Sequence, residues 1–168
     1  MQIKFGTDGW RAIIAQEFTT DNVARVAYAT ALWVKSISQN PSISIGHDCR
    51  FGGSLFTETA IKVICAEGVK VYAHKGICAT PMISLACVKL NTTAGVVITA
   101  SHNPPSYNGF KLKSNYGGPT TPADIAKVEA LIPEKTNIPT ITLEELQVKN
   151  LLEYVDMETM YFNHVEAS

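Results

Sequence analysis

The chain has 168 residues, of which 46% are hydrophobic and 17% charged, so it is long enough for one domain with a hydrophobic core. Its formal net charge of −1 lacks the basic excess that nucleic-acid binding needs. It has no apolar stretch long enough to span a bilayer, and its N-terminus lacks the apolar centre of a signal peptide. We therefore expect a cytoplasmic protein with neither a nucleic-acid nor a membrane partner.

Helical and strand patterns alternate along the chain. Short apolar runs predict strands at residues 42–46, 69–73 and 95–99. Cap residues followed by apolar periodicity predict four helices that end near residues 38, 68, 90 and 133. The expected caps are Thr20 or Asp21, Ser54, Thr80 and Thr121. On the first helix one face is apolar, with Val23, Val26, Ala27, Ala31 and Val34.

After the third strand, Asn108-Gly109 predicts a turn, so the segment Phe110 to Lys113 is expected to run antiparallel to its neighbour. Strands separated by helices otherwise imply parallel pairing with right-handed crossovers. The fold class expected is therefore α/β: a three-layer α/β/α domain with a small mixed, mainly parallel sheet.

The C-terminal region is less regular. Residues 1–133 form the expected domain, and residues 134–168 are expected to be a linker and a helical tail, with the helix at 143–165. An amphipathic tail either packs on its own domain or leads toward a second one, and we favour the second reading.

The cysteines Cys49, Cys65, Cys78 and Cys87 include no CxxC pair, so we expect buried free thiols rather than a zinc site.

Residues 95–113, GVVITASHNPPSYNGFKLK, are the most informative segment. An apolar strand runs into Ser101, and Pro104 and Pro105 stiffen the chain that follows, which leaves the loop N–H groups able to face an anion. Period-2 alternation places Lys111 and Lys113 on one face. Each feature alone has a simpler interpretation. The serine is typical of a turn, and the two lysines are typical of the solvent-exposed face of an edge strand. Together they predict a serine that holds a phosphate.

Three segments carry a family resemblance. Residues 99–105 (TASHNPP) with 107–111 (YNGFK) resemble the phosphoserine loop of the α-D-phosphohexomutases, a superfamily that includes phosphoglucomutase, phosphomannomutase and phosphoglucosamine mutase. Residues 5–11 (FGTDGWR) and 46–50 (GHDCR) resemble two other segments of that family. The resemblance spans nearly all of residues 1–132 and implies the same α/β/α fold.

The resemblance also implies site residues. Ser101 would be the phosphorylated residue, and its phosphate oxygen would be a ligand of Mg²⁺. Lys111 would act as general acid or base on the sugar hydroxyl, with Arg11 near the phosphoryl group. The other expected site residues support the loop or bind phosphate: His102, Asn103, Thr7 and Arg50.

The implied reaction moves a phosphoryl group between the 1 and 6 positions of a hexose through a bisphosphorylated sugar. The family's DGDGDR-like metal loop and its sugar-binding loop are not found in this sequence. We therefore expect the remaining Mg²⁺ ligands to lie outside this chain, the missing domains and hexose phosphate to be its partners, and the chain alone to have little mutase activity.

Other functions fit parts of the pattern. A serine hydrolase would pair Ser101 with His102, but no G-x-S-x-G elbow surrounds the serine. A non-catalytic phosphate-binding or interaction module is a second alternative, and it would account for the absence of the family's other domains from this sequence. Within the family, residues 5–11 favour the phosphoglucomutase/phosphomannomutase branch over the phosphoglucosamine mutase branch.

Overall fold

The structure is a computed structural model that describes residues 1–7 and 9–167. Within this part of the chain a six-stranded sheet has the order β1-β5-β4-β2-β3-β6. The strands are β1 (Trp10–Ile13), β2 (Ser42–His47), β3 (Lys70–Ile77), β4 (Ala94–Ile98), β5 (Tyr107–Ser114) and β6 (Leu152–Tyr154). Strand β5 is antiparallel to β1 and β4, and the other neighbours pair in parallel, so all strands but β5 share one direction.

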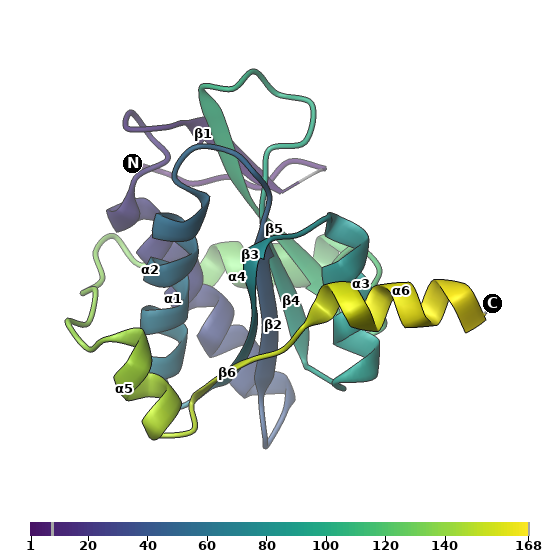
Figure 1. Ribbon diagram of the computed structural model, residues 1–168. Coiled ribbons are helices and arrows are strands. Elements are labelled where there is room, and N and C mark those ends of the chain that lie inside the picture. Colours follow the sequence, from purple (N-terminus) through teal and green to yellow (C-terminus); the bar gives the residue numbers. More distant parts are fainter. Residues whose placement is uncertain (8, 168) are drawn as a thin grey trace.

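Helices cover both faces of the sheet. They are α1 (Thr20–Ile37), α2 (Gly53–Ala66), α3 (Thr80–Lys89), α4 (Pro122–Leu131), α5 (Leu143–Val148) and α6 (Met157–Ala167). Helices α1, α2, α4 and α5 lie on one side, and α3 and α6 lie on the other (Figure 1). This arrangement confirms the predicted three-layer α/β/α domain with a mixed, mainly parallel sheet. In the described residues, every helix is too short or too polar to cross a membrane.

The larger part of the core lies between the sheet and α1. The five apolar residues predicted for one face of this helix are all fully buried, which confirms its orientation. Phe18 precedes the helix and packs between the rings of Trp10 and Phe56, with ring centroids 4.7 Å away in both cases. These contacts fix β1 and α2 against the same end of α1.

Three helix starts differ from the expected caps. At α1 the cap is Thr19, one residue earlier than predicted, and its hydroxyl accepts a hydrogen bond from the N–H of Asn22. Gly52 occupies the cap position of α2 with φ +79°, so Ser54 is already helical. Ala79 precedes α3, which makes Thr80 its first helical residue. The predicted cap Thr121 is confirmed, since its hydroxyl accepts from the N–H of Asp124.

The turn predicted at Asn108-Gly109 is wrong. Both residues lie inside β5, and residues 99–106 make the reversal from β4. Gly109 is needed for close packing, because a Cβ there would collide with the carbonyl oxygen of Thr99 and lie 2.9 Å from that of Trp10. Asn108 is buried, and its side chain donates to the carbonyl of Phe51 at 3.3 Å. The predicted antiparallel pairing is nevertheless confirmed.

The continuous helix predicted for residues 143–165 is also wrong. Asn150 adopts φ +60° after α5, and β6 then adds to the sheet beside β3 before α6 begins. Leu146, Leu152 and Met157 are buried, so the tail packs on this domain as far as the start of α6. The far end of α6 extends away from the sheet (Figure 1). The role of residues 134–168 as a connection to a second domain stays a prediction.

Candidate functional site

The Ser101 loop lies where the parallel strands β2 and β4 end. Because carboxyl ends of neighbouring parallel strands share one edge, the segment after His47 meets the segment after Ile98. The N–H of Asp48 donates to the carbonyl of Ile98 at 3.2 Å, which joins the two segments directly. This edge therefore brings the predicted phosphoserine loop and the GHDCR segment together.

Ser101 itself is exposed and has φ +53°. For a residue other than glycine this left-handed conformation costs about 1–3 kcal/mol and persists only where neighbouring groups hold it. The N–H of Ser101 donates to Thr99 Oγ1 at 3.2 Å. The N–H of Asn103 donates to the carbonyl of Ala100 at 3.0 Å and closes a tight turn around the serine. The loop thus presents the serine to solvent from a fixed backbone.

Arg50 binds the backbone of the Ser101 loop through its guanidinium group. Its Nη1 donates to the carbonyls of Pro104 at 2.8 Å and Tyr107 at 3.0 Å. Its Nη2 donates to the carbonyls of Ser101 at 2.8 Å and Asn103 at 2.6 Å. A planar guanidinium has a rigid fork of donors, so it can hold several carbonyls at once.

Asp48 connects Arg50 to the serine segment. Its Oδ1 accepts from the backbone N–H of Arg50 at 3.0 Å, and its Oδ2 lies 3.8 Å from Arg50 Nε. The same Oδ2 accepts from Thr99 Oγ1 at 2.5 Å, a charge-assisted hydrogen bond. Asp48 thereby links two of the groups that hold the backbone of Ser101.

Arg11 reaches the loop from β1. It lies in register with Gly109 of β5, and its Nη1 donates to Asn103 Oδ1 at 2.6 Å. Four of the predicted site residues are therefore brought together at one edge: Ser101, Asn103, Arg11 and Arg50. Two arginines beside the exposed serine make this a favourable place for an anion.

Lys111 and Thr7 lie together in a neighbouring cavity of about 620 Å³. Pairing of β1 with β5 ends at Phe110, and Gly9 lies close beside Lys111, since a Cβ on Gly9 would be 3.1 Å from Lys111 Cα. Lys111 is in register with Val97 of β4, further into the sheet than Ser101. Among the described residues no hydrogen bond joins Lys111 to Ser101, and the exposed His102 makes no side-chain hydrogen bond.

Lys113 lies on the same face of β5 as Lys111, but it is buried and not exposed to solvent. The reason is that Lys113 lies between Gly95 of β4 and Pro119, on the face of the sheet where Ile83 and Cys87 of α3 pack. Burial lowers the pKa of Lys113, and the nearby charge of Lys111 lowers this pKa further. Lys113 is therefore a buried lysine, and no hydrogen bond among the described residues joins it to the Ser101 loop.

The described residues do not form a metal site by themselves. No group of three or more His, Cys, Asp or Glu side chains lies close enough together within residues 1–7 and 9–167 to hold an ion. Asp48 is already bonded to Thr99 and Arg50. Asp8, which belongs to the FGTDGWR segment, lies outside the described residues. The donors present do not fit Mg²⁺, which generally requires carboxylate and phosphate oxygens together.

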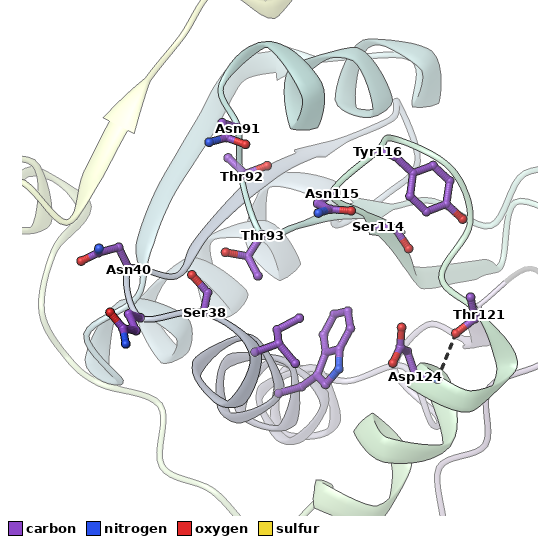
Figure 2. Close-up of a pocket in the computed structure, with 13 residues that line it drawn as sticks. Ser38, Asn40, Asn91, Thr92, Thr93, Ser114, Asn115, Tyr116, Thr121 and Asp124 are labelled. Atoms are coloured by element: carbon purple, nitrogen blue, oxygen red, sulfur yellow. Dashed lines mark hydrogen bonds between the residues drawn. The ribbon is translucent and has the colours of Figure 1, made fainter.

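A second cavity, of about 510 Å³, lies at the opposite edge of the sheet, where α1 ends and β4 begins. Asn40, Thr93, Asn115 and Asp124 line it from different segments (Figure 2). Its lining contains none of the predicted site residues. It is also smaller than the cavity of about 620 Å³ that contains Lys111 and Thr7.

The cysteines divide into two kinds. Cys65, Cys78 and Cys87 are buried free thiols as predicted, whereas Cys49 is exposed between Asp48 and Arg50. Burial raises the pKa of Cys65 to about 12 and that of Cys78 to about 11. The prediction of burial is thus wrong for Cys49, because the loop after β2 is at the surface.

Sequence reasoning assigned no role to Asp48 or Thr99, although both have structural roles in the site. Both belong to segments that the sequence singled out, but their side chains act on the backbone of other residues. The signal available was their position, directly after two strands predicted to be parallel.

Comparison with known proteins agrees with this fold. Residues 2–138 match the family model described as phosphoglucomutase/phosphomannomutase, alpha/beta/alpha domain I. A phosphoglucosamine mutase from Prochlorococcus marinus (strain MIT 9312) is 34% identical over 157 residues, which cover 94% of this chain and 34% of the relative. A "probable phosphoribomutase" from Schizosaccharomyces pombe is 34% identical over 89% of this chain and 26% of its own length.

A solved structure is similar over almost the whole chain. A crystal structure from Thermus thermophilus, provisionally described as a phosphomannomutase, matches with a TM-score of 0.90 and 33% identity. The match covers 99% of this chain and 36% of the other, so this chain spans about a third of the length of the proteins that it resembles. The chain belongs to the phosphoglucomutase/phosphomannomutase family and contains the family's α/β/α domain I.

Proposed function

We propose that this chain is the phosphoserine-bearing part of a phosphohexomutase that interconverts hexose 1-phosphate and hexose 6-phosphate, with glucose or mannose as the sugar, through a bisphosphorylated intermediate. The observation that carries the proposal is the conformation of Ser101. It is exposed at φ +53°, and both of its backbone polar groups are bonded. Two arginines approach the same loop.

The residues of this chain support the transfer in distinct ways. In the forward step the bond between phosphorus and Ser101 Oγ breaks while a sugar hydroxyl oxygen bonds to phosphorus. A proton passes from that hydroxyl to Lys111, and Ser101 Oγ takes up a proton from solvent. In the reverse step Lys111 returns its proton to the leaving sugar oxygen while Ser101 Oγ loses its own. Arg11 stabilises charge on the phosphoryl oxygens, and Asn103 orients Arg11 through their 2.6 Å hydrogen bond. Thr7 lies in the Lys111 cavity and is proposed to bind substrate there.

The metal is a property of the family rather than of the described residues. Phosphohexomutases are generally Mg²⁺-dependent. The contribution proposed for this chain is one phosphate oxygen on Ser101, with the other ligands supplied by domains outside it. Turnover of glucose 1-phosphate by this chain alone is therefore expected to be negligible, and a coupled assay for glucose 6-phosphate measures it.

Phosphoryl uptake tests the proposal without requiring the missing domains to complete a cycle. The chain is incubated with glucose 1,6-bisphosphate, and its intact mass is followed by mass spectrometry. We expect a gain of about 80 Da in the wild type and none in Ser101→Ala. Ser106→Ala is the matched control, since Ser106 is an exposed serine of the same loop. Equal gains in Ser101→Ala and the wild type would overturn the proposal.

The sugar has a second candidate. The relative from Prochlorococcus marinus is a phosphoglucosamine mutase, which favours glucosamine as the alternative. Comparing uptake from the 1,6-bisphosphates of glucose, mannose and glucosamine separates the branches. Uptake fastest from glucosamine 1,6-bisphosphate would reject glucose and mannose as the preferred sugars.

A further inference from the structure

The hydrogen bonds around Ser101 form a closed ring of four residues. Asp48 accepts from Thr99 at 2.5 Å, and Thr99 Oγ1 accepts from the N–H of Ser101 at 3.2 Å. The carbonyl of Ser101 accepts from Arg50 Nη2 at 2.8 Å. The backbone N–H of Arg50 then donates to Asp48 at 3.0 Å, which returns the ring to its start.

The ring holds the only two polar groups that the backbone of Ser101 has. One is bonded to Thr99 and the other to Arg50, so rotation of the serine to a negative φ would break both bonds. Such rotation would also redirect Oγ, because φ sets the direction of the side chain relative to the loop. The ring therefore fixes where a phosphate on Ser101 would lie.

All four terminal N–H donors of Arg50 are used within the loop. They bind the carbonyls of Pro104, Tyr107, Ser101 and Asn103. Its remaining donor, Nε, faces Asp48 at 3.8 Å. Arg50 in this geometry has no terminal donor left for a substrate phosphate, in contrast to the role expected from the sequence.

The geometry points to Arg50, Asp48 and Thr99 as positioning residues that set the conformation of Ser101 for phosphoryl transfer. This inference rests on the proposed function only for its effect on transfer, since the ring itself is independent of any reaction. Lysine cannot replace Arg50, because an ammonium is a point charge and has no planar fork for four carbonyls. Thr99→Val keeps the shape of the side chain and removes its hydroxyl, whereas Thr99→Ser keeps the hydroxyl.

The first test measures the backbone. Amide hydrogen exchange at Ser101 and Asn103 is followed by NMR in the wild type, Arg50→Lys, Thr99→Val and Thr99→Ser. We expect exchange at both amides to rise about tenfold or more in Arg50→Lys and Thr99→Val, with the core amides of β4 unchanged. Thr99→Ser is expected to stay near the wild type. Unchanged exchange in both ring variants would overturn the inference, whether or not the chain takes up phosphate.

The second test separates positioning from phosphate binding. The rate of phosphoryl uptake is measured against the concentration of glucose 1,6-bisphosphate. A positioning residue lowers the maximal rate, here by about tenfold or more, and leaves the half-saturating concentration within about twofold. If Arg50 binds a substrate phosphate directly, Arg50→Lys raises the half-saturating concentration instead, and that result overturns the inference.

Arg25→Lys is the matched control for both tests. Arg25 also donates to backbone carbonyls, those of Pro133 at 2.6 Å and Met1 at 2.9 Å. It lies on α1, away from the Ser101 loop. We expect its replacement to change neither the exchange at Ser101 nor the uptake rate by more than about twofold. If Arg25→Lys and Arg50→Lys changed exchange and uptake equally, both arginines would act only through the stability of the whole domain. That result would contradict the inference.

Discussion

The two edges of the sheet present polar groups in different ways. At the edge where β2 and β4 end, two arginines donate hydrogen bonds to the loop that carries a serine in a left-handed conformation. At the opposite edge a cavity of about 510 Å³ has a lining with many amide and hydroxyl groups and neither lysine nor arginine (Figure 2). The first edge has a cavity of about 620 Å³ beside it and is richer in charge and in backbone constraint. For a phosphate site, those two properties are the more informative ones.

The largest expected effect concerns Lys111, which lies beside the Ser101 edge. Lys111→Met removes the group proposed to return a proton to the leaving sugar oxygen, so we expect phosphoryl uptake from glucose 1,6-bisphosphate to slow by about 100-fold. Lys127→Met is the control, because Lys127 is an exposed lysine of α4. Uptake is measured by intact mass over time, and wild-type rates in Lys111→Met would exclude Lys111 from the chemistry.

Gly109 supports the same edge through packing. A methyl group at this position would collide with the carbonyl oxygen of Thr99, so we expect Gly109→Ala to lower the free energy of unfolding by about 2 kcal/mol or more. Gly6→Ala is the control, since a Cβ there meets only a carbonyl oxygen at 3.7 Å. Urea denaturation compares the two, and equal stabilities would show that the strands tolerate a wider spacing.

Thiol reactivity separates the surface of the Ser101 edge from the interior. Cys49 is exposed, whereas burial raises the pKa of Cys65 to about 12 and of Cys78 to about 11. We expect a thiol reagent at pH 8 to label Cys49 at least about tenfold faster than the buried cysteines. Labelled peptides identify the sites. Labelling of Cys78 as fast as Cys49 would contradict the burial of Cys78 in the segment between β3 and α3.

The same two buried thiols give a pH dependence. Their folded pKa values lie above the ordinary thiol value of 9.0, so the folded chain keeps protons that the unfolded chain releases. Their contribution to the free energy of unfolding is complete below pH 9 and is lost as pH rises toward 11 to 12. Urea denaturation at about pH 8, 9 and 10 is expected to show falling stability, with a shallower fall in Cys65→Ala. Equal slopes in both proteins would contradict the shift.

The smallest effect is expected at the opposite edge. Asn115 lines the cavity shown in Figure 2, and its side chain bonds to none of the described residues. We expect Asn115→Ala to change phosphoryl uptake by less than about twofold and stability by less than about 0.5 kcal/mol. A tenfold loss of uptake in this variant would show that the opposite edge also contributes to phosphoryl transfer, which would contradict the difference described between the two edges.

Sequence patterns predicted the parts of this fold that depend on local periodicity. The buried face of α1, the strand before Ser101 and the three layers all follow from apolar spacing and chain order. Strand β6 escaped prediction because it has only three residues, and its position depends on pairing with β3. Gly109 was misread because a glycine needed for close strand packing has the same sequence signal as a turn glycine.

Sequence reasoning named several residues that meet at the Ser101 loop but not the contacts between them. Motif residues identified Ser101, Arg11 and Arg50, which the fold places at one edge. No local pattern indicates that Arg50 donates to four carbonyls 51 to 57 residues further along the chain. Such contacts depend on the loop conformation after two parallel strands, which only the folded chain specifies.

The most direct measurement is the position of the phosphate itself. After incubation with glucose 1,6-bisphosphate, the chain is digested and the peptide covering residues 95–111 is sequenced by tandem mass spectrometry. The phosphoserine account predicts an added mass of about 80 Da on Ser101, absent from Ser101→Ala and retained in Ser106→Ala. A phosphate on another residue, or an unmodified Ser101 in a folded wild-type chain, would contradict it.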